Sequence, residues 1–280
     1  MKSRRQILIT NDDSYTSKGL QTLCEIMSAY GDVTVVAPKR GQSGMSMAVT
    51  MGLKPIGVKR LEDRQGQRWW YLDGTPASCI KYGIDNIFHP EMPDLVVSGI
   101  NHGSNAATAA IYSGTIGAAM EGAVNLIPSI GVSLDSFEAD ADFGVVRTFL
   151  PRILDFLLER MQPKTGLFYN INFPAHKAEE VKGVKVCHMG LAHWEREYRP
   201  YFEFLDSLGR KSSEEDLLYA RRAEEQGEEL VVMAGDFTDN PQNSYPADHH
   251  LLAQGWITIV PGNIDNTDYS EIERLCDITL

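Results

Sequence analysis

The apolar residues between positions 7 and 173 follow two alternating patterns. Short continuous apolar runs, typical of strands buried on both faces of a sheet, alternate with longer stretches whose apolar residues recur at helical spacing. The first example is an apolar run at 7–10, a helical stretch at 19–30 and a second apolar run at 32–37. A strand, a helix and a strand in this order predict a βαβ unit, whose crossover connection is nearly always right-handed.

The same alternation predicts a larger α/β domain. Further strands are expected at 94–98, 129–134 and 167–173, and further helices at 76–87, 115–126 and 140–161. Pro151 lies inside the last of these helical stretches, where a proline is expected to kink the helix or to begin a new one. Together these elements favour an open, doubly wound, mostly parallel α/β sheet.

The alternation ends near residue 185. The remainder contains strand-like runs, a charged helical stretch, a last short helix and an aromatic, charged segment at 194–204. The expected elements are strands at 184–186, 229–233 and 256–260 and helices at 214–226 and 270–276. We therefore expect an α/β core at residues 1–185 and a C-terminal β-rich extension at residues 186–280. The extension is expected to consist of a hairpin, the charged helix and a closing strand and helix, and to pack on the core and on partner subunits.

The composition argues against nucleic-acid polymers and membranes as partners. The 280 residues are 43% hydrophobic, which is ample for a large core, and carry a formal net charge of -12 at pH 7. An acidic surface repels nucleic-acid backbones and anionic membranes. The N-terminal MKSRRQ is followed by too few apolar residues for a signal peptide, and no apolar run is long enough to cross a bilayer. We therefore expect a soluble, cytoplasmic protein.

The cysteines carry no sign of a disulfide framework or a zinc site. They lie far apart and include no CxxC pair; they are Cys24, Cys79, Cys187 and Cys276. Such spacing favours buried, reduced thiols.

Polar side chains follow the first three strands expected in the core. Asp12 and Asp13 come directly after the first strand, Ser43 lies in the loop after the second, and Asn101 and Asn105 follow the third. Because ligands bind beyond the carboxyl ends of the strands in open parallel sheets, we expect these side chains to converge. Carboxylate, hydroxyl and amide oxygens suit a hard divalent cation such as Mg²⁺ or Mn²⁺ better than zinc. A cation would also offset the repulsion between the adjacent aspartates.

The segment Ser113-Gly114-Thr115 stands where the helix at 115–126 is expected to begin. Backbone N–H groups, hydroxyls and the positive end of a helix dipole favour a bound phosphate, and the glycine permits close approach of an oxyanion. A cation beside an anion cradle predicts hydrolysis of a phosphate ester. Each motif alone also fits a structural role, since either can simply cap a helix. Their joint placement after successive strands favours the functional interpretation.

Five segments of the first 135 residues occur in an order and spacing that resemble the SurE family, the survival-protein 5′-nucleotidases. They are ILITNDD with Gly19-Leu20 just after it, VVAPKRGQSGMS followed by Thr50, GTPASC (74–79), PDLVVSGINHGSN (93–105) and IYSGTIGAAMEG (111–122). Weaker likeness continues through LFYNINFP and GWITIVP. Five ordered motifs make the resemblance far more specific than any one of them.

The resemblance implies a Rossmann-like core and a divalent-metal-dependent phosphatase that acts on nucleoside 5′-monophosphates, with 3′-monophosphates and short polyphosphate as further substrates. It also implies one Mg²⁺ or Mn²⁺ ion per subunit, and an extension that exchanges elements between the subunits of a homodimer or homotetramer. Carried over by motif, the metal ligands are Asp12, Asp13, Ser43 and Asn101, and the phosphate contacts are Asn105, Ser113, Gly114 and Thr115. Either aspartate would serve to accept a proton from the attacking water.

The sequence departs from the family pattern in several places. Ser14 stands where the family usually has a glycine, so a positive φ at this position would strain the backbone. No arginine directly precedes Ser43, and the segment 193–245 is longer and more charged than the usual hairpin. Substrate preference and oligomeric contacts therefore stay open.

Three histidines near these motifs permit more than one interpretation. His102 either acts on a proton or a phosphate or only lines the loop. His249 and His250 resemble a metal-binding pair, but adjacent residues on a strand would point apart, which favours a surface or interface role. The family resemblance further suggests that Asp248 helps to position the closing segment.

Other functions fit less well. A dinucleotide-binding oxidoreductase needs GxGxxG after its first strand, where this chain has NDDSYTSKG. A phospho-receiver signalling module also places an acidic pair after its first strand, but it needs an aspartate after the middle strand, where this chain has SGIN at 98–101. A catalytically silent relative, which binds metal and nucleotide without turnover, is the remaining alternative.

Overall fold

The computed structural model describes residues 4–278 except 54, 139, 162–165 and 244–245. The chain divides into two compact units, one formed by residues 1–190 together with 245–280 and the other by residues 191–244. Every residue assigned above to a metal or phosphate site belongs to the first unit.

The first unit is built on a nine-stranded sheet in the part of the chain that the structure describes, with the order β3-β4-β2-β1-β5-β6-β7-β13-β8. The strands are β1 (Arg5–Thr10), β2 (Gly31–Pro38), β3 (Val58–Arg60), β4 (Arg68–Leu72), β5 (Leu95–His102), β6 (Ser129–Leu134), β7 (Leu167–Phe173), β8 (Val184–Val186) and β13 (Ile257–Asn263). The six strands from β4 to β7 are mutually parallel, whereas β3 and β13 run antiparallel to their neighbours β4 and β7. This mixed, mostly parallel sheet confirms the predicted α/β class.

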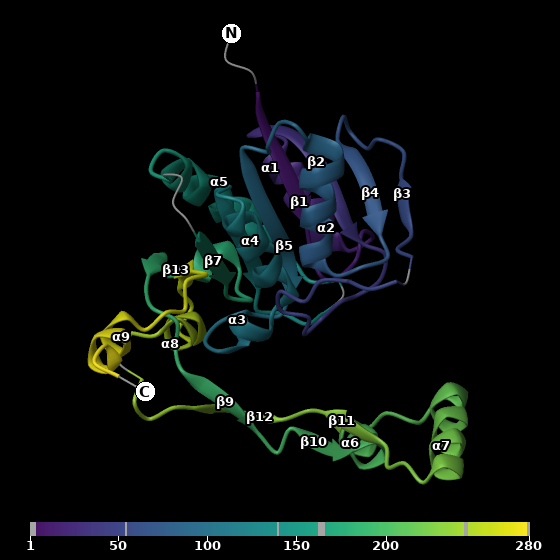
Figure 1. Ribbon diagram of the computed structural model, residues 1–280. Helices are drawn as coiled ribbons and strands as arrows, with labels where there is room; N and C mark the ends of the chain where they lie inside the picture. Colours follow the sequence, from purple (N-terminus) through teal and green to yellow (C-terminus); the bar gives the residue numbers. More distant parts are fainter. Residues whose placement is uncertain (1–3, 54, 139, 162–165, 244–245, 279–280) are drawn as a thin grey trace. The chain divides into compact units, whose positions relative to one another are not determined.

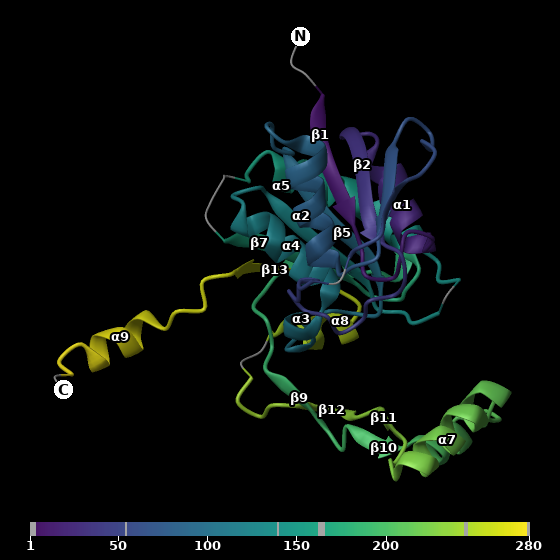
Figure 2. The same cartoon turned by 45° about the vertical axis from the view of Figure 1, so that its right-hand side comes forward.

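Helices cover both faces of this sheet, because its central strands are apolar on both sides (Figures 1 and 2). On one face, Ile7 and Ile9 of β1 share a hydrophobic cluster with residues of α1 (Lys18–Met27) and α5 (Gly144–Leu158). On the other face, Leu8 packs with residues of α2 (Pro76–Tyr82) and α4 (Gly114–Val124). The remaining helical segments of this unit are η1 (Gly83–Phe88), α3 (Ala109–Tyr112), η2 (Ala178–Glu180), α8 (Asp248–Ala253) and α9 (Tyr269–Leu275).

Helix α5 continues through Pro151, so no new helix begins at the proline. Leu150 and Ile153, on either side of it, are both buried in the cluster against the sheet. This packing outweighs the loss of one backbone hydrogen bond within the helix.

The second unit consists of two short antiparallel ribbons and two helices. The ribbons pair β9 (Ala192–Glu195) with β12 (Asp236–Asp239) and β10 (Tyr198–Pro200) with β11 (Val231–Met233), and the helices are α6 (Tyr201–Ser207) and α7 (Glu214–Gln226). Helix α7 begins with a capping box between Ser213 and Asp216 and ends at Gly227, which has a positive φ. The charged helix predicted from the sequence is therefore present.

The closing part of the chain returns to the first unit. Within the expected extension at residues 186–280, β13 pairs with β7 and β8 inside the large sheet, and residues 245–280 cluster with the core. This strand pairing is long-range, so the local sequence pattern does not predict it. The part that this extension plays in oligomerisation stays a prediction.

Two further findings concern the described helices and the cysteines. None of the described helices combines the length and the apolar character needed to cross a membrane. The four cysteines are free thiols, and burial raises the pKa of both Cys24 and Cys79 above the ordinary thiol value.

Candidate functional site

The carboxyl ends of β2, β1 and β5 lie side by side, because these strands are parallel neighbours in the sheet. Asp12 and Asp13 follow β1 after the single residue Asn11, the loop with Ser43 follows β2, and Asn101 lies at the end of β5. The sheet thus brings the predicted metal ligands to one edge, as expected for an open parallel sheet.

Asp12 is almost fully buried, with 4% of its surface exposed. Its Oδ1 accepts a hydrogen bond of 2.6 Å from the hydroxyl of Thr115, and its backbone oxygen accepts one of 2.7 Å from the N–H of Gln42. Burial first, and the negative charge of Asp13 in addition, raise the pKa of Asp12 from 3.8 to about 6, while the bond from Thr115 acts in the opposite direction. The carboxylate is therefore held where a positive charge would be strongly favoured.

Asp13 contacts the end of β5. Its Oδ2 accepts a hydrogen bond of 3.2 Å from the backbone N–H of His102 and lies 2.8 Å from Nδ1 of the same residue. His102 therefore does more than line the loop, because it holds a predicted metal ligand. The two residues are far apart in the sequence, and only the neighbouring position of β1 and β5 brings them together.

Asn101 is oriented by the turn that follows it. Its Nδ2 donates a hydrogen bond of 2.7 Å to the backbone oxygen of Gly103, which leaves the amide oxygen Oδ1 for another partner. The pairing of β5 with β6 shifts in register between Ser98 and Asn101, so the strand is irregular where it delivers this side chain.

Asn105 is held firmly by buried polar residues. Its backbone N–H donates to Oδ1 of Asn172 at 2.7 Å, its Nδ2 donates to the hydroxyl of Ser133 at 2.7 Å, and its backbone oxygen accepts from Asn170 at 2.8 Å. Asn172 in turn donates to Asn170. The motifs did not identify these partners, although the polar positions in the expected strand LFYNINF were a visible signal.

The segment Ser113-Gly114-Thr115 begins α4, as predicted, but its two hydroxyls have structural partners. The Ser113 hydroxyl caps the helix by accepting from the N–H of Ile116 at 3.1 Å, and the Thr115 hydroxyl donates to Asp12. A Cβ atom on Gly114 would lie 3.0 Å from Cβ of Asp12, a tight contact, so glycine gives the helix start room to approach the carboxylate this closely. Backbone N–H groups are the main donors that this helix start offers to an anion.

The loop that carries Ser43 is tied to α3 and α4. The backbone N–H of Ser46 donates to the backbone oxygen of Tyr112 at 2.9 Å, and its hydroxyl donates to the backbone oxygen of Ile111 at 2.8 Å. A methyl group on Gly117 of α4 would overlap the backbone oxygen of Ser46. This glycine therefore allows the loop to pack directly on the helix.

Ser14 has a φ of 93°, which confirms that this position needs the left-handed region. The Ser14 hydroxyl offsets part of the strain through a hydrogen bond with the hydroxyl of Thr16, 3.0 Å away. Nδ2 of Asn11 donates a hydrogen bond of 3.0 Å to the backbone oxygen of Ser14. Positive φ at a residue other than glycine stores about 1–3 kcal/mol of strain.

A Ser14→Gly substitution is expected to stabilise the metal-free protein by about 1 kcal/mol, because glycine adopts this φ without the steric penalty of a Cβ atom. Urea unfolding in EDTA measures the change. Ser14→Ala is the control and is expected to destabilise, since it keeps the Cβ atom and loses the hydroxyl contact. A glycine variant less stable than the unmodified protein would contradict the strain.

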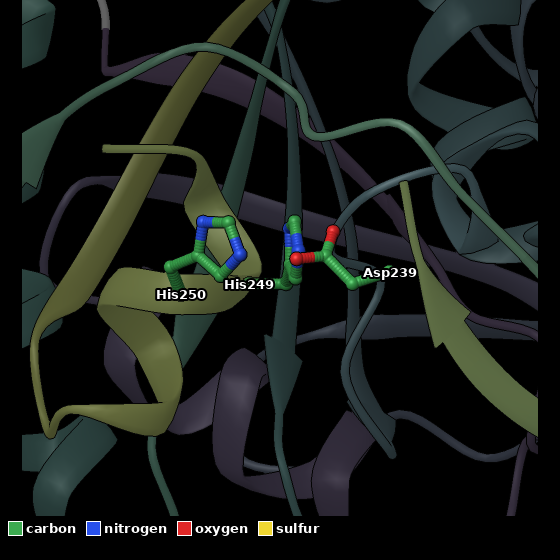
Figure 3. Close-up of side chains that lie close together, drawn as sticks. All are labelled: Asp239, His249 and His250. Atoms are coloured by element: carbon green, nitrogen blue, oxygen red, sulfur yellow. The ribbon is translucent and has the colours of Figure 1, made fainter. Parts of the chain in front are cut away.

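The assumption of a strand, on which His249 and His250 would point apart, is wrong. Both lie on the short helix α8, with ring centroids 4.0 Å apart and planes inclined by 39° (Figure 3). Asp248, at the start of the same helix, accepts from the backbone N–H groups of Ala107 and Gly190, each at 2.9 Å. Asp248 thus ties the closing segment to the loop after β5, as the family resemblance suggests.

The chain matches known proteins over nearly its whole length. The family model described as "Survival protein SurE" matches residues 7–196. The chain is 36% identical to the 5′-nucleotidase SurE of Christiangramia forsetii, over 100% of this chain and 98% of that protein, and 37% identical to the 5′-nucleotidase SurE of Cytophaga hutchinsonii, over 98% and 96%. The crystal structure of the SurE protein from Aquifex aeolicus aligns with a TM-score of 0.74 at 27% identity, covering 96% of this chain and 97% of that one. The family model and these relatives show that the chain belongs to the SurE family of survival proteins.

Proposed function

We propose that this protein is a divalent-metal-dependent phosphatase that hydrolyses nucleoside 5′-monophosphates to nucleoside and phosphate. The observation that carries the proposal is the adjacent pair Asp12 and Asp13 at the carboxyl edge of the sheet, next to the start of α4. The relatives from Christiangramia forsetii and Cytophaga hutchinsonii, which are named 5′-nucleotidases, support the same activity here.

The residues present fit one hard divalent ion, Mg²⁺ or Mn²⁺, per subunit. Asp12, Asp13, Ser43 and Asn101 offer oxygen ligands. Burial first, and the charge of Asp13 in addition, raise the pKa of Asp12, so a bound cation would stabilise its charged form. When bound, such an ion acts as a Lewis acid on a phosphoryl oxygen and lowers the pKa of a bound water. The site residues would hold the ion through these four side chains.

The start of α4 would orient the phosphate. The backbone N–H groups of Gly114 and Thr115 and the positive end of the helix dipole would stabilise a bound anion, whereas the N–H of Ser113 donates to the backbone oxygen of Ala110 at 3.4 Å. Asn105 would contribute from its rigid loop. Asp12 and Asp13 are the carboxylates available to accept the proton of the attacking water. Nucleoside 3′-monophosphates and short polyphosphate present the same terminal phosphate and belong to the proposed substrates.

A homodimer or homotetramer in the cytoplasm completes the proposal. The second unit exposes apolar side chains on its ribbons that a subunit interface would bury, among them Tyr198, Met233 and Phe237. Light scattering of the purified protein measures the assembly.

The activity assay uses purified protein with single nucleoside 5′-monophosphates and Mn²⁺ or Mg²⁺. We expect phosphate release that EDTA abolishes and that an Asp13→Asn substitution lowers at least about 100-fold, because a metal ligand is lost. Asp85→Asn, which changes an exposed aspartate on η1, is the matched control and should leave the rate unchanged. Wild-type metal-dependent activity in the Asp13 variant would contradict the ligand assignment. Binding of metal and nucleotide without phosphate release would instead identify a catalytically silent relative.

A further inference from the structure

His102 presents two donors to a single oxygen of Asp13. The backbone N–H of His102 lies 3.2 Å from Oδ2, and its ring Nδ1 lies 2.8 Å from the same atom. Because both donors converge on Oδ2, they fix the carboxylate in one orientation and leave its Oδ1 for another partner.

The surroundings of the ring identify its tautomer. Nε2 of His102 is buried and has no hydrogen-bond partner within the described part of the chain, and the ring meets Phe143 edge to face at 5.4 Å and 84°. A proton on Nε2 would be buried without an acceptor, whereas a proton on Nδ1 points at the carboxylate. A ring proton on Nδ1, directed at Oδ2 of Asp13, therefore fits both observations.

The turn at residues 101–103 orients two predicted ligands at once. Asn101 is oriented by its bond to the backbone oxygen of Gly103, and Asp13 is oriented by His102. We propose that His102 is a positioning residue, which turns the Oδ1 atom of Asp13 toward the divalent ion by holding Oδ2. This inference rests on the proposed function for the presence of that ion.

The test is a calorimetric titration of metal-free protein with Mn²⁺ alone, in the absence of substrate. His102→Leu removes the ring donor and keeps a side chain of similar bulk, and it is expected to weaken Mn²⁺ binding about 10- to 100-fold. His102→Asn places its Nδ2 near the position of the ring Nδ1 and is expected to bind Mn²⁺ within about threefold of the unmodified protein. His176→Leu is the matched control, since His176 is an exposed histidine 3.9 Å from a carboxylate of its own, that of Glu180.

A positioning role also predicts how activity responds. With saturating Mn²⁺ the His102→Leu variant should recover most of its kcat, because His102 is expected to touch neither the substrate nor the ion. Thermal unfolding checks that the variants fold. If His102→Leu does not fold, His102→Ala is used in its place.

Two results would overturn the inference. One is a leucine or alanine variant that binds Mn²⁺ as tightly as the unmodified protein, and the other is an asparagine variant as weak as the leucine variant. These failures are distinct from failure of the proposed function. If the variants bind Mn²⁺ in the predicted order of affinity but the unmodified protein releases no phosphate, the proposed phosphatase activity is refuted and the role of His102 is retained.

Discussion

An Asp12→Asn variant is expected to lose metal-dependent phosphate release by at least about 1,000-fold and, at the same time, to be more stable than the unmodified protein when metal is absent. The loss follows because the variant lacks a charged ligand at the proposed ion. The gain follows from the raised pKa of Asp12, about 6 in the folded protein against 3.8 ordinarily, caused first by burial. The charged carboxylate is therefore unfavourable in the metal-free fold.

The sign of the pH dependence follows from the same shift. A carboxyl group whose pKa is raised on folding binds its proton more tightly in the folded state, so its destabilising effect is fully present above pH 6 and is lost as the pH falls toward 3.8. At about 1.4 kcal/mol per pKa unit, the gain at pH 8 is on the order of 1–3 kcal/mol, and it should shrink between pH 8 and pH 5.

Urea unfolding in EDTA at the two pH values tests this expectation. The asparagine oxygen can still accept the bond from Thr115, so the substitution changes the charge with little change in packing. Asp85→Asn is the matched control on the surface and should show no gain at either pH. A variant that is less stable than the unmodified protein at pH 8 would contradict the electrostatic description of the site.

Asp248→Ala is expected to destabilise the protein by about 3–5 kcal/mol. Asp248 is fully buried, with an exposed fraction of 0%, and its two oxygens accept from the backbone N–H groups of Ala107, Gly190 and His249. Removal of a buried charged acceptor leaves these donors without their partner. The loop after β5 and the closing segment would lose their link, so phosphate release should fall as well.

Chemical unfolding measures this loss. Asp248→Asn keeps one acceptor oxygen, which can serve Gly190 and His249 but not Ala107, and it should show an intermediate loss. Asp85→Ala is the surface control. An alanine variant within about 1 kcal/mol of the unmodified protein would mean that water replaces the carboxylate at these donors.

The sequence by itself determined the elements of the core and the candidate chemistry of their ends. The apolar runs that became β1, β2 and β6 are signals within a few residues, and such local periodicity decides whether a segment is strand or helix. The rule that polar residues after parallel strands converge then placed the loops of Asp12, Ser43 and Asn101 along one edge of the sheet.

Only the tertiary structure decided which distant groups meet. The bond between His102 and Asp13 joins residues 89 positions apart, and the bond between Ala107 and Asp248 joins residues 141 positions apart. The return of β13 to the large sheet, like these bonds, depends on strand order and on the packing of whole elements. The φ of Ser14 also depends on the tertiary structure, because the backbone conformation of one residue follows the path that the assembled loop requires. Local patterns carry no information about such partners, since the free energy that selects them arises only when the core is packed.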